Sequence, residues 1–238
     1  MGRQCCITTV NSSPGNRTLG VIGGLGPAAT LDFHAKLLQF SEAVTDQEHI
    51  RILIDSNPAV PDRNAALAGT GESPGPHLAK MAAGLEQAGA GLIVMACNAA
   101  HAWQAEIEAA MSVPFLSMID AVVAETMQHR PRRVGLLAAN ATLDAQLYQT
   151  AFAGHGVEVI HPDREEFMAL LYRIKSGDTG DEVRSRMRQL AVSLEGIDVL
   201  VAGCTEVPLV LTSFETPVID SAAALARAAL AELNQPAA

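Results

Sequence analysis

Short apolar runs rich in Val, Ile and Leu alternate along this chain with longer segments whose apolar residues recur every three or four positions. Such runs are typical of strands buried on both faces of a parallel sheet, and the longer spacing is typical of amphipathic helices. The runs predict strands at Leu19–Gly23, His49–Asp55, Gly91–Ala96, Pro114–Met118, Arg133–Leu137, Val157–Ile160, Asp198–Ala202 and Pro217–Ile219. The amphipathic segments predict helices at Ala28–Ser41, Gly75–Ala88, Ala102–Met111, Thr142–Ala153, Arg164–Lys175, Asp181–Glu195 and Ala222–Leu233. The alternation predicts an α/β fold with parallel sheets.

The two halves of this series resemble each other. Gly20-Val21-Ile22 opens the first half and Gly135-Leu136-Leu137 opens the second, and Pro114 and Pro217 begin matching strands. This order predicts two similar α/β domains with a cleft between them. We expect a tail at residues 1–17, a first domain of residues 18–118 plus 221–238, and a second domain of residues 119–220.

Two cysteines end apolar runs at matching places in the two halves. Cys97 and Cys204 therefore fall at the carboxyl ends of strands, where open α/β sheets place ligands. Two thiols facing each other could act as an acid and a base on opposite faces of one carbon. His101 could pair with Cys97 as in a Cys/His nucleophile, although a histidine that packs or tunes is more common. Glu206 is either a proton acceptor for Cys204 or a helix N-terminal acid.

A glycine-rich turn follows the first strand. Gly24, Gly26 and Ala29 fit the dinucleotide-binding pattern G-x-G-x-x-A, so an NAD- or nucleotide-binding protein is the main alternative. However, Asp55 lies farther along the chain than the usual spacing of about 20 residues. Pro27 also removes one backbone N–H from the helix start. Binding of a substrate carboxylate by Gly24, or a plain tight turn, is favoured.

Two cations could hold an anionic ligand. Arg63 follows Asp62 in a proline-rich loop after the second strand, and its planar fork suits a carboxylate. A solvated turn with a local ion pair is the alternative. Lys175 ends a helix before Gly177, so it is either a capping cation or a second carboxylate clamp.

Composition narrows the class of partner. The 238 residues carry a formal net charge of -10, with 49% hydrophobic residues, no basic run and no apolar stretch of membrane-span length. We therefore expect no nucleic-acid partner and no membrane partner. The four cysteines form no Cys-x-x-Cys pair, which argues against zinc and favours free thiols in a cytoplasmic protein.

Four motifs together resemble the aspartate/glutamate racemase family, in particular its cofactor-independent aspartate racemase branch. The resemblance extends from about Leu19 to Leu233. Its motifs are Gly23-Gly24-Leu25-Gly26-Pro27, Pro61-Asp62-Arg63, Cys97-Asn98-Ala99-Ala100-His101 and Gly203-Cys204-Thr205-Glu206-Val207-Pro208.

This resemblance implies two doubly wound parallel-sheet domains related by pseudo-twofold symmetry, with the active site in the interdomain cleft. It also implies interconversion of L- and D-aspartate or glutamate by two cysteines, without a cofactor or metal. The expected ligand is a small dicarboxylic amino acid, and the expected assembly is a homodimer. Relatives that keep one cysteine run decarboxylation or isomerisation, and the presence of both thiols favours racemisation. Ala99 and Asn64 stand where the family commonly has threonine, which bears on substrate identity. The implied catalytic residues are Cys97, Cys204, Asp62 and Glu206, and the implied substrate-binding residues are Arg63, Lys175, Asn98, Thr205, Gly24 and Thr142.

Overall fold

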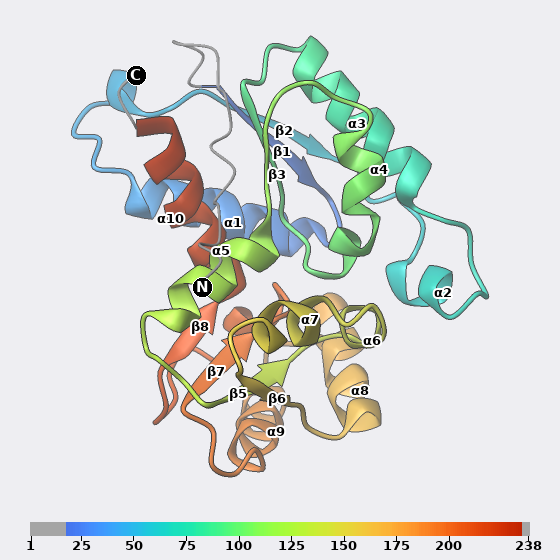
Figure 1. Ribbon diagram of the computed structural model, residues 1–238, viewed down its shortest axis with the longest axis vertical. Helices are drawn as coiled ribbons and strands as arrows, with labels where there is room; N and C mark the ends of the chain where they lie inside the picture. Colours follow the sequence, from blue (N-terminus) through green and yellow to red (C-terminus); the bar gives the residue numbers. More distant parts are fainter. Residues whose placement is uncertain (1–17, 235–238) are drawn as a thin grey trace, which may run out of the picture.

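The chain forms two four-stranded parallel sheets (Figure 1). The computed structural model describes residues 18–234, so the predicted tail at 1–17, with Cys5 and Cys6, lies outside the described residues. The first sheet has the order β2-β1-β3-β4 and the second has the equivalent order β6-β5-β7-β8. The α/β fold class and the repetition of one sheet in the two halves are confirmed. The strands are β1 (Leu19–Gly23), β2 (Ile52–Ser56), β3 (Leu92–Met95), β4 (Phe115–Leu116), β5 (Arg133–Leu137), β6 (Glu158–Ile160), β7 (Val199–Ala202) and β8 (Val218–Asp220).

Equivalent strands carry the two cysteines. β3 pairs with β1, and β7 pairs with β5, in parallel register. All residues of β3 and β7 are buried, as expected of continuous aliphatic runs covered on both faces. Cys97 follows β3 by one intervening residue, and Cys204 follows β7 in the same way. Both thiols therefore lie at the carboxyl edges of their sheets.

Helices cover the faces of both sheets. They are α1 (Pro27–Phe40), α2 (Arg63–Leu67), α3 (Gly75–Gln87), α4 (Gln104–Glu108), α5 (Met118–Met127), α6 (Asn140–Asp144), α7 (Leu147–Ala153), α8 (Arg164–Lys175), α9 (Asp181–Val192) and α10 (Ser221–Asn234). Short 3-10 helices are η1 (Asp46–Glu48), η2 (Ala99–Trp103) and η3 (Val207–Leu209).

Several elements differ from the sequence prediction. The predicted loop around Arg63 contains the helix α2, which Asp62 caps by accepting a hydrogen bond from the N–H of Ala65 at 2.9 Å. The predicted strand Pro114–Met118 is shorter, because Ser117 caps α5, a helix that the sequence analysis did not predict. The predicted helix Thr142–Ala153 is divided into α6 and α7 at Gln146, whose φ is 51°. Capping and left-handed residues thus decide boundaries that apolar spacing leaves open.

One hydrophobic core joins the two halves. It includes Val21 and Val94 from the first sheet, Val134 and Val201 from the second, and Leu225 from α10. Helix α10 packs against both α1 and α5, as Figure 1 shows. Because this core is continuous, the domain boundaries at 118/119 and 220/221 stay predictions.

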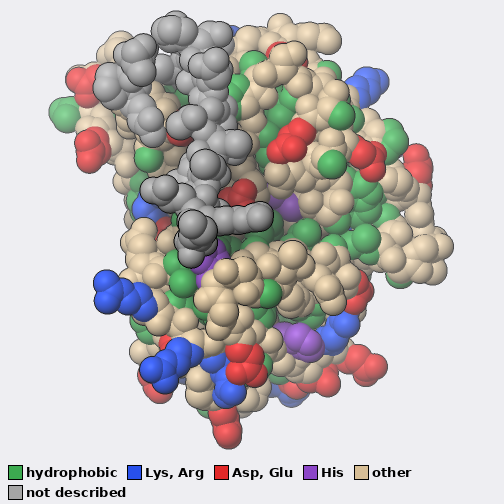
Figure 2. Space-filling model, in the orientation of Figure 1, with side chains coloured by type: hydrophobic (Ala, Val, Ile, Leu, Met, Phe, Trp, Pro, Cys, Tyr) green, Lys and Arg blue, Asp and Glu red, His purple; other side chains and the backbone are tan. Residues whose placement is uncertain are grey.

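Charged side chains of both signs are interspersed over the second half on the face that Figure 2 shows. Arg186 forms an ion pair with Glu166, and Arg173 forms one with Glu182 at 2.9 Å. Exposed pairs of this kind add little stability, but they leave the arginines neutralised by nearby carboxylates. Within residues 18–234, no helix has the length and apolarity that a membrane span requires.

Candidate active site

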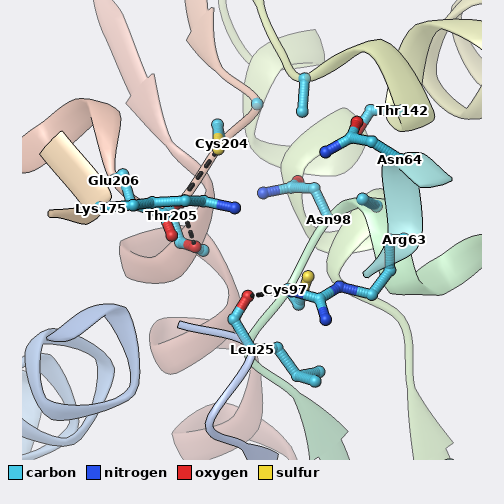
Figure 3. Close-up of a pocket in the computed structure, with 13 residues that line it drawn as sticks. Leu25, Arg63, Asn64, Cys97, Asn98, Thr142, Lys175, Cys204, Thr205 and Glu206 are labelled. Carbon is cyan, nitrogen blue, oxygen red and sulfur yellow. Dashed lines mark hydrogen bonds between the residues drawn. The ribbon is translucent and has the colours of Figure 1, made fainter. Parts of the chain in front are cut away.

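A pocket lies between the two halves, where the carboxyl ends of the strands of both sheets meet (Figure 3). It contains about 330 Å³ of space that no protein atom fills, part of which is open to solvent. Loops after β1, β3, β5 and β7 contribute to its wall, together with the start of α2 and the end of α8. The lining residues are Leu25, Arg63, Asn64, Cys97, Asn98, Ala99, Ala139, Thr142, Lys175, Gly203, Cys204, Thr205 and Glu206.

All of the predicted site residues line this pocket except Gly24 and Asp62. Gly24 has a φ of +82°, and a Cβ there would lie 2.3 Å from the backbone nitrogen of Asn57. Its N–H donates to the Thr30 hydroxyl at 2.8 Å, so this N–H is already satisfied. For Gly24, the structure therefore corresponds to the tight-turn alternative and not to the carboxylate-binding or nucleotide-binding alternatives.

Asp62 caps α2 and does not line the pocket. Its Oδ1 accepts the N–H of Ala65, so the carboxylate is engaged in holding the first turn of the helix. Its expected role as a catalytic acid is therefore corrected to a structural one: it fixes the helix start from which Arg63 projects.

Three backbone carbonyls orient the guanidinium of Arg63. Nη1 donates to the oxygens of Val60 at 3.3 Å and Pro61 at 3.0 Å, and Nη2 donates to the oxygen of Leu25 at 2.9 Å. Since a guanidinium has five N–H donors, two remain for a ligand. Arg63 is only 9% exposed, so an anion that binds there replaces little water. The solvated-turn alternative for this arginine is wrong.

Lys175 extends into the pocket from the end of α8 (Figure 3). Within the described part of the chain, its ammonium makes no hydrogen bond and no ion pair with a side chain. Burial of the ammonium alone would lower the pKa of Lys175. The nearby Cys204 and Glu206 raise this pKa by more than burial lowers it, so the net shift is upward. Lys175 therefore stays charged and available to an anionic ligand.

Cys204 donates a hydrogen bond to a buried carboxylate. Its Sγ donates to Oε2 of Glu206 at 3.0 Å, and the Thr205 hydroxyl donates to the same oxygen at 3.3 Å. Burial, followed by the charge of Glu206, raises the pKa of Cys204 well above its usual range, and Lys175 opposes this shift. The helix η3 that follows Cys204 is only three residues long, and burial dominates the shift of this pKa.

The His101 ring fixes the loop that carries Cys97. Its Nδ1 lies 2.8 Å from the carbonyl oxygen of Cys97, and its Nε2 accepts the N–H of Met118 at 3.0 Å. Burial lowers the pKa of His101 to about 4, so the ring is neutral with its proton on Nδ1. Because both nitrogens are engaged by backbone groups, the packing alternative is confirmed and the Cys/His pair is wrong.

Asn98 connects the two halves beside Cys97. The Tyr148 hydroxyl donates a short hydrogen bond to Oδ1 of Asn98, and Nδ2 of Asn98 donates to the Ser221 hydroxyl at 2.9 Å. Tyr148 comes from α7, and Ser221 begins α10. The sequence analysis missed both residues, because Tyr148 follows the apolar spacing of an ordinary core residue and Ser221 has no motif.

Known proteins resemble this chain in sequence and in fold. The sequence model of the family described as Asp/Glu/Hydantoin racemase matches residues 22–229. The fold resembles the aspartate racemase of Picrophilus torridus, with a TM-score of 0.85 and 32% sequence identity over 91% of this chain and 94% of that one. It also resembles an aspartate racemase homologue from Pyrococcus horikoshii OT3, with a TM-score of 0.73 and 27% identity over 92% of this chain and 100% of that one.

Among curated sequences, the chain is 27% identical over 220 residues to the broad specificity amino-acid racemase RacX of Bacillus subtilis (strain 168), which covers 88% of this chain and 95% of the relative. The fold and the site thus define an isomerase of the amino-acid racemase class. The chain belongs to the Asp/Glu/hydantoin racemase family.

Proposed function

We propose that this protein interconverts the enantiomers of an acidic amino acid, aspartate or glutamate, by proton transfer between two cysteines. The observation that carries the proposal is the presence of both thiols in one pocket, each after the equivalent strand of its sheet, together with Arg63 and Lys175. Racemisation requires a proton to leave one face of the α-carbon and another to arrive on the opposite face. A pocket between two similar halves supplies one thiol from each side.

The charges of the pocket match those of an acidic amino acid. Its lining contains two cations, Arg63 and Lys175, and one carboxylate, Glu206. Aspartate and glutamate carry two carboxylates and one ammonium, which is the complementary set. A neutral amino acid leaves one of the two cations without an anionic partner, and this mismatch is costly in a partly desolvated site.

The proton transfer uses the thiols in opposite protonation states. Cys204 holds its proton in the ligand-free pocket, because burial and Glu206 stabilise the neutral form. Cys97 as thiolate removes the α-proton, and Cys204 donates its own proton to the opposite face. In the reverse direction the roles exchange: Cys204, which the forward step leaves as thiolate, removes the α-proton, and Cys97 donates its own proton to the opposite face.

The carbanion formed between these steps needs electrostatic stabilisation. Lys175 and the free N–H donors of Arg63 can bond to carboxylate oxygens as negative charge develops on them. The guanidinium is held in place by three carbonyls before the substrate arrives, so little reorganisation accompanies the reaction.

Heavy-water exchange tests the two-thiol reaction. Incubation of one enantiomer in D₂O should place deuterium on the α-carbon of the product. Cys97→Ala and Cys204→Ala should each abolish racemisation, while each variant keeps slow α-proton exchange of only the enantiomer whose α-proton faces the remaining thiol. Circular dichroism and urea unfolding control for folding. Full racemisation by either variant, or equal turnover of acidic and neutral amino acids by the unmodified protein, would contradict the proposal.

A further inference from the structure

We propose that the two crossovers between the halves position Cys97, and that His101 and Ser221 are the positioning residues through which they do so. The crossovers are the two segments in which the chain passes from one half to the other. The first, Ser117-Met118, joins β4 to α5, and the second, Asp220-Ser221, joins β8 to α10. β4 and β8 occupy equivalent places in their sheets. The inference rests on the proposed function, because it concerns how one of the two reacting thiols is held.

His101 connects Cys97 to the first crossover. Its Nδ1 donates to the carbonyl oxygen of Cys97 at 2.8 Å, and its Nε2 accepts the N–H of Met118 at 3.0 Å. The ring is 4% exposed, so water does not compete for either nitrogen. Because both nitrogens of a planar ring are engaged, the ring cannot turn, and the carbonyl of Cys97 keeps a fixed place relative to Met118.

Asn98, directly after Cys97, connects the same loop to the second crossover. Its Nδ2 donates to the hydroxyl oxygen of Ser221 at 2.9 Å, across 123 positions of the chain. Ser221 is completely buried, and Asn98 is almost completely so. Separation of two such buried groups leaves a polar atom without a partner, so the hydrogen bond resists movement of the loop away from the crossover.

The second crossover is itself fixed to the first half. Oδ1 of Asp220 accepts the N–H groups of Ala222 at 2.9 Å and Ala223 at 3.2 Å, which holds the first turn of α10. Oδ2 of Asp220 lies 2.9 Å from Nζ of Lys36 in α1, and both side chains are largely shielded from solvent. Ser221 is therefore a fixed support for Asn98.

Cys204 has no equivalent support in the described part of the chain. Its thiol and the Thr205 hydroxyl both donate to Glu206, a residue of the same loop. Within residues 18–234, no side chain of this loop makes a hydrogen bond to either crossover. Cys97 is 7% exposed and Cys204 is 8% exposed, so the two thiols differ in support but hardly in exposure. Cys204 is therefore the internal reference for any effect on Cys97.

Two substitutions release Cys97 from one crossover each. Ser221→Ala removes the acceptor of Asn98. His101→Gln keeps an acceptor for the N–H of Met118 but removes the donor to the carbonyl oxygen of Cys97. In both variants, alkylation of Cys97 by iodoacetamide should rise about fivefold relative to alkylation of Cys204, because the loop that carries Cys97 opens more often. Mass spectrometry of the two cysteine-containing peptides from one sample measures this ratio, which a loss of overall stability would leave unchanged.

The kinetic test uses substrate deuterated at the α-carbon. Displacement of Cys97 should slow the proton transfer at Cys97 and leave the one at Cys204 unchanged. The isotope effect on kcat/KM should then rise for the enantiomer whose α-proton Cys97 removes, and fall for the other enantiomer. The exchange that Cys204→Ala retains identifies the first of these enantiomers.

Thr126→Val is the matched control. Thr126 is also completely buried, and its hydroxyl donates to the carbonyl oxygen of Val122 at 2.7 Å, within α5 and not to the loop of Cys97. The control should change neither the alkylation ratio nor the isotope effects. Circular dichroism checks that each variant is folded, and an unchanged alkylation ratio in either folded variant overturns the inference. Absence of racemisation by the unmodified protein counts against the proposed function alone, because the alkylation ratio does not depend on turnover.

Discussion

Replacing Tyr148 with phenylalanine removes a single oxygen from the connection between the two halves. Tyr148 is completely buried, and burial raises the pKa of its hydroxyl, so this group is a permanent donor to Oδ1 of Asn98. The substitution leaves the ring packing against Phe152, at 6.2 Å between ring centroids, essentially unchanged. The measured loss of stability should therefore arise from the lost hydrogen bond and not from a cavity.

The magnitude follows from what Asn98 loses. Asn98 is 2% exposed, so water cannot replace the missing donor at its Oδ1. A buried acceptor left without its partner costs about 1–3 kcal/mol. For a chain of this size, that loss corresponds to a decrease in Tm of roughly 2–12 °C. Asn98 also follows Cys97 directly, so freedom of its side chain should lower kcat as well.

Urea unfolding monitored by circular dichroism, together with racemisation kinetics, measures both effects. Tyr172→Phe is the matched control, because Tyr172 is 51% exposed and its hydroxyl has no hydrogen bond within the described residues. The control should change the free energy of unfolding by no more than about 0.5 kcal/mol. Equal stability of Tyr148→Phe and Tyr172→Phe would refute the reasoning that the hydrogen bond joins the two halves.

Two further predictions concern stability. His101 has a pKa of about 4 in the folded protein against an ordinary value of 6.5, so its contribution of roughly 3 kcal/mol to the free energy of unfolding is complete above pH 6.5 and is lost as the pH falls toward 4. The free energies of unfolding of the unmodified protein and of His101→Gln should therefore converge as the pH falls over this interval, and a constant difference would contradict the assignment. Gly24→Ala should lower the free energy of unfolding by at least about 2 kcal/mol, because Gly24 has a φ of +82° and the Cβ of an alanine there would lie 2.3 Å from the backbone nitrogen of Asn57. Gly156→Ala, at a φ of +70° with nothing within 4 Å, should cost only about 1 kcal/mol in the same urea titration, and equal losses would show that crowding is absent at Gly24.

The sequence by itself determined the strands that follow from a run of neighbouring residues of one kind. Continuous aliphatic runs predicted β1, β3, β5 and β7 nearly to the residue, because a strand buried on both faces needs such a run. The repeated order of these runs placed Cys97 and Cys204 after equivalent strands.

Only the tertiary structure decided what the polar residues of the site do. The carboxylate of a residue such as Asp62 can take part in catalysis or cap a helix. In the folded chain it accepts the N–H of Ala65, so it caps the helix. Likewise, no spacing in the sequence places Tyr148 on Asn98 or Asn64 on Ala141. These bonds join residues far apart in the chain, and whether a donor is free or satisfied depends on the packing of both halves together.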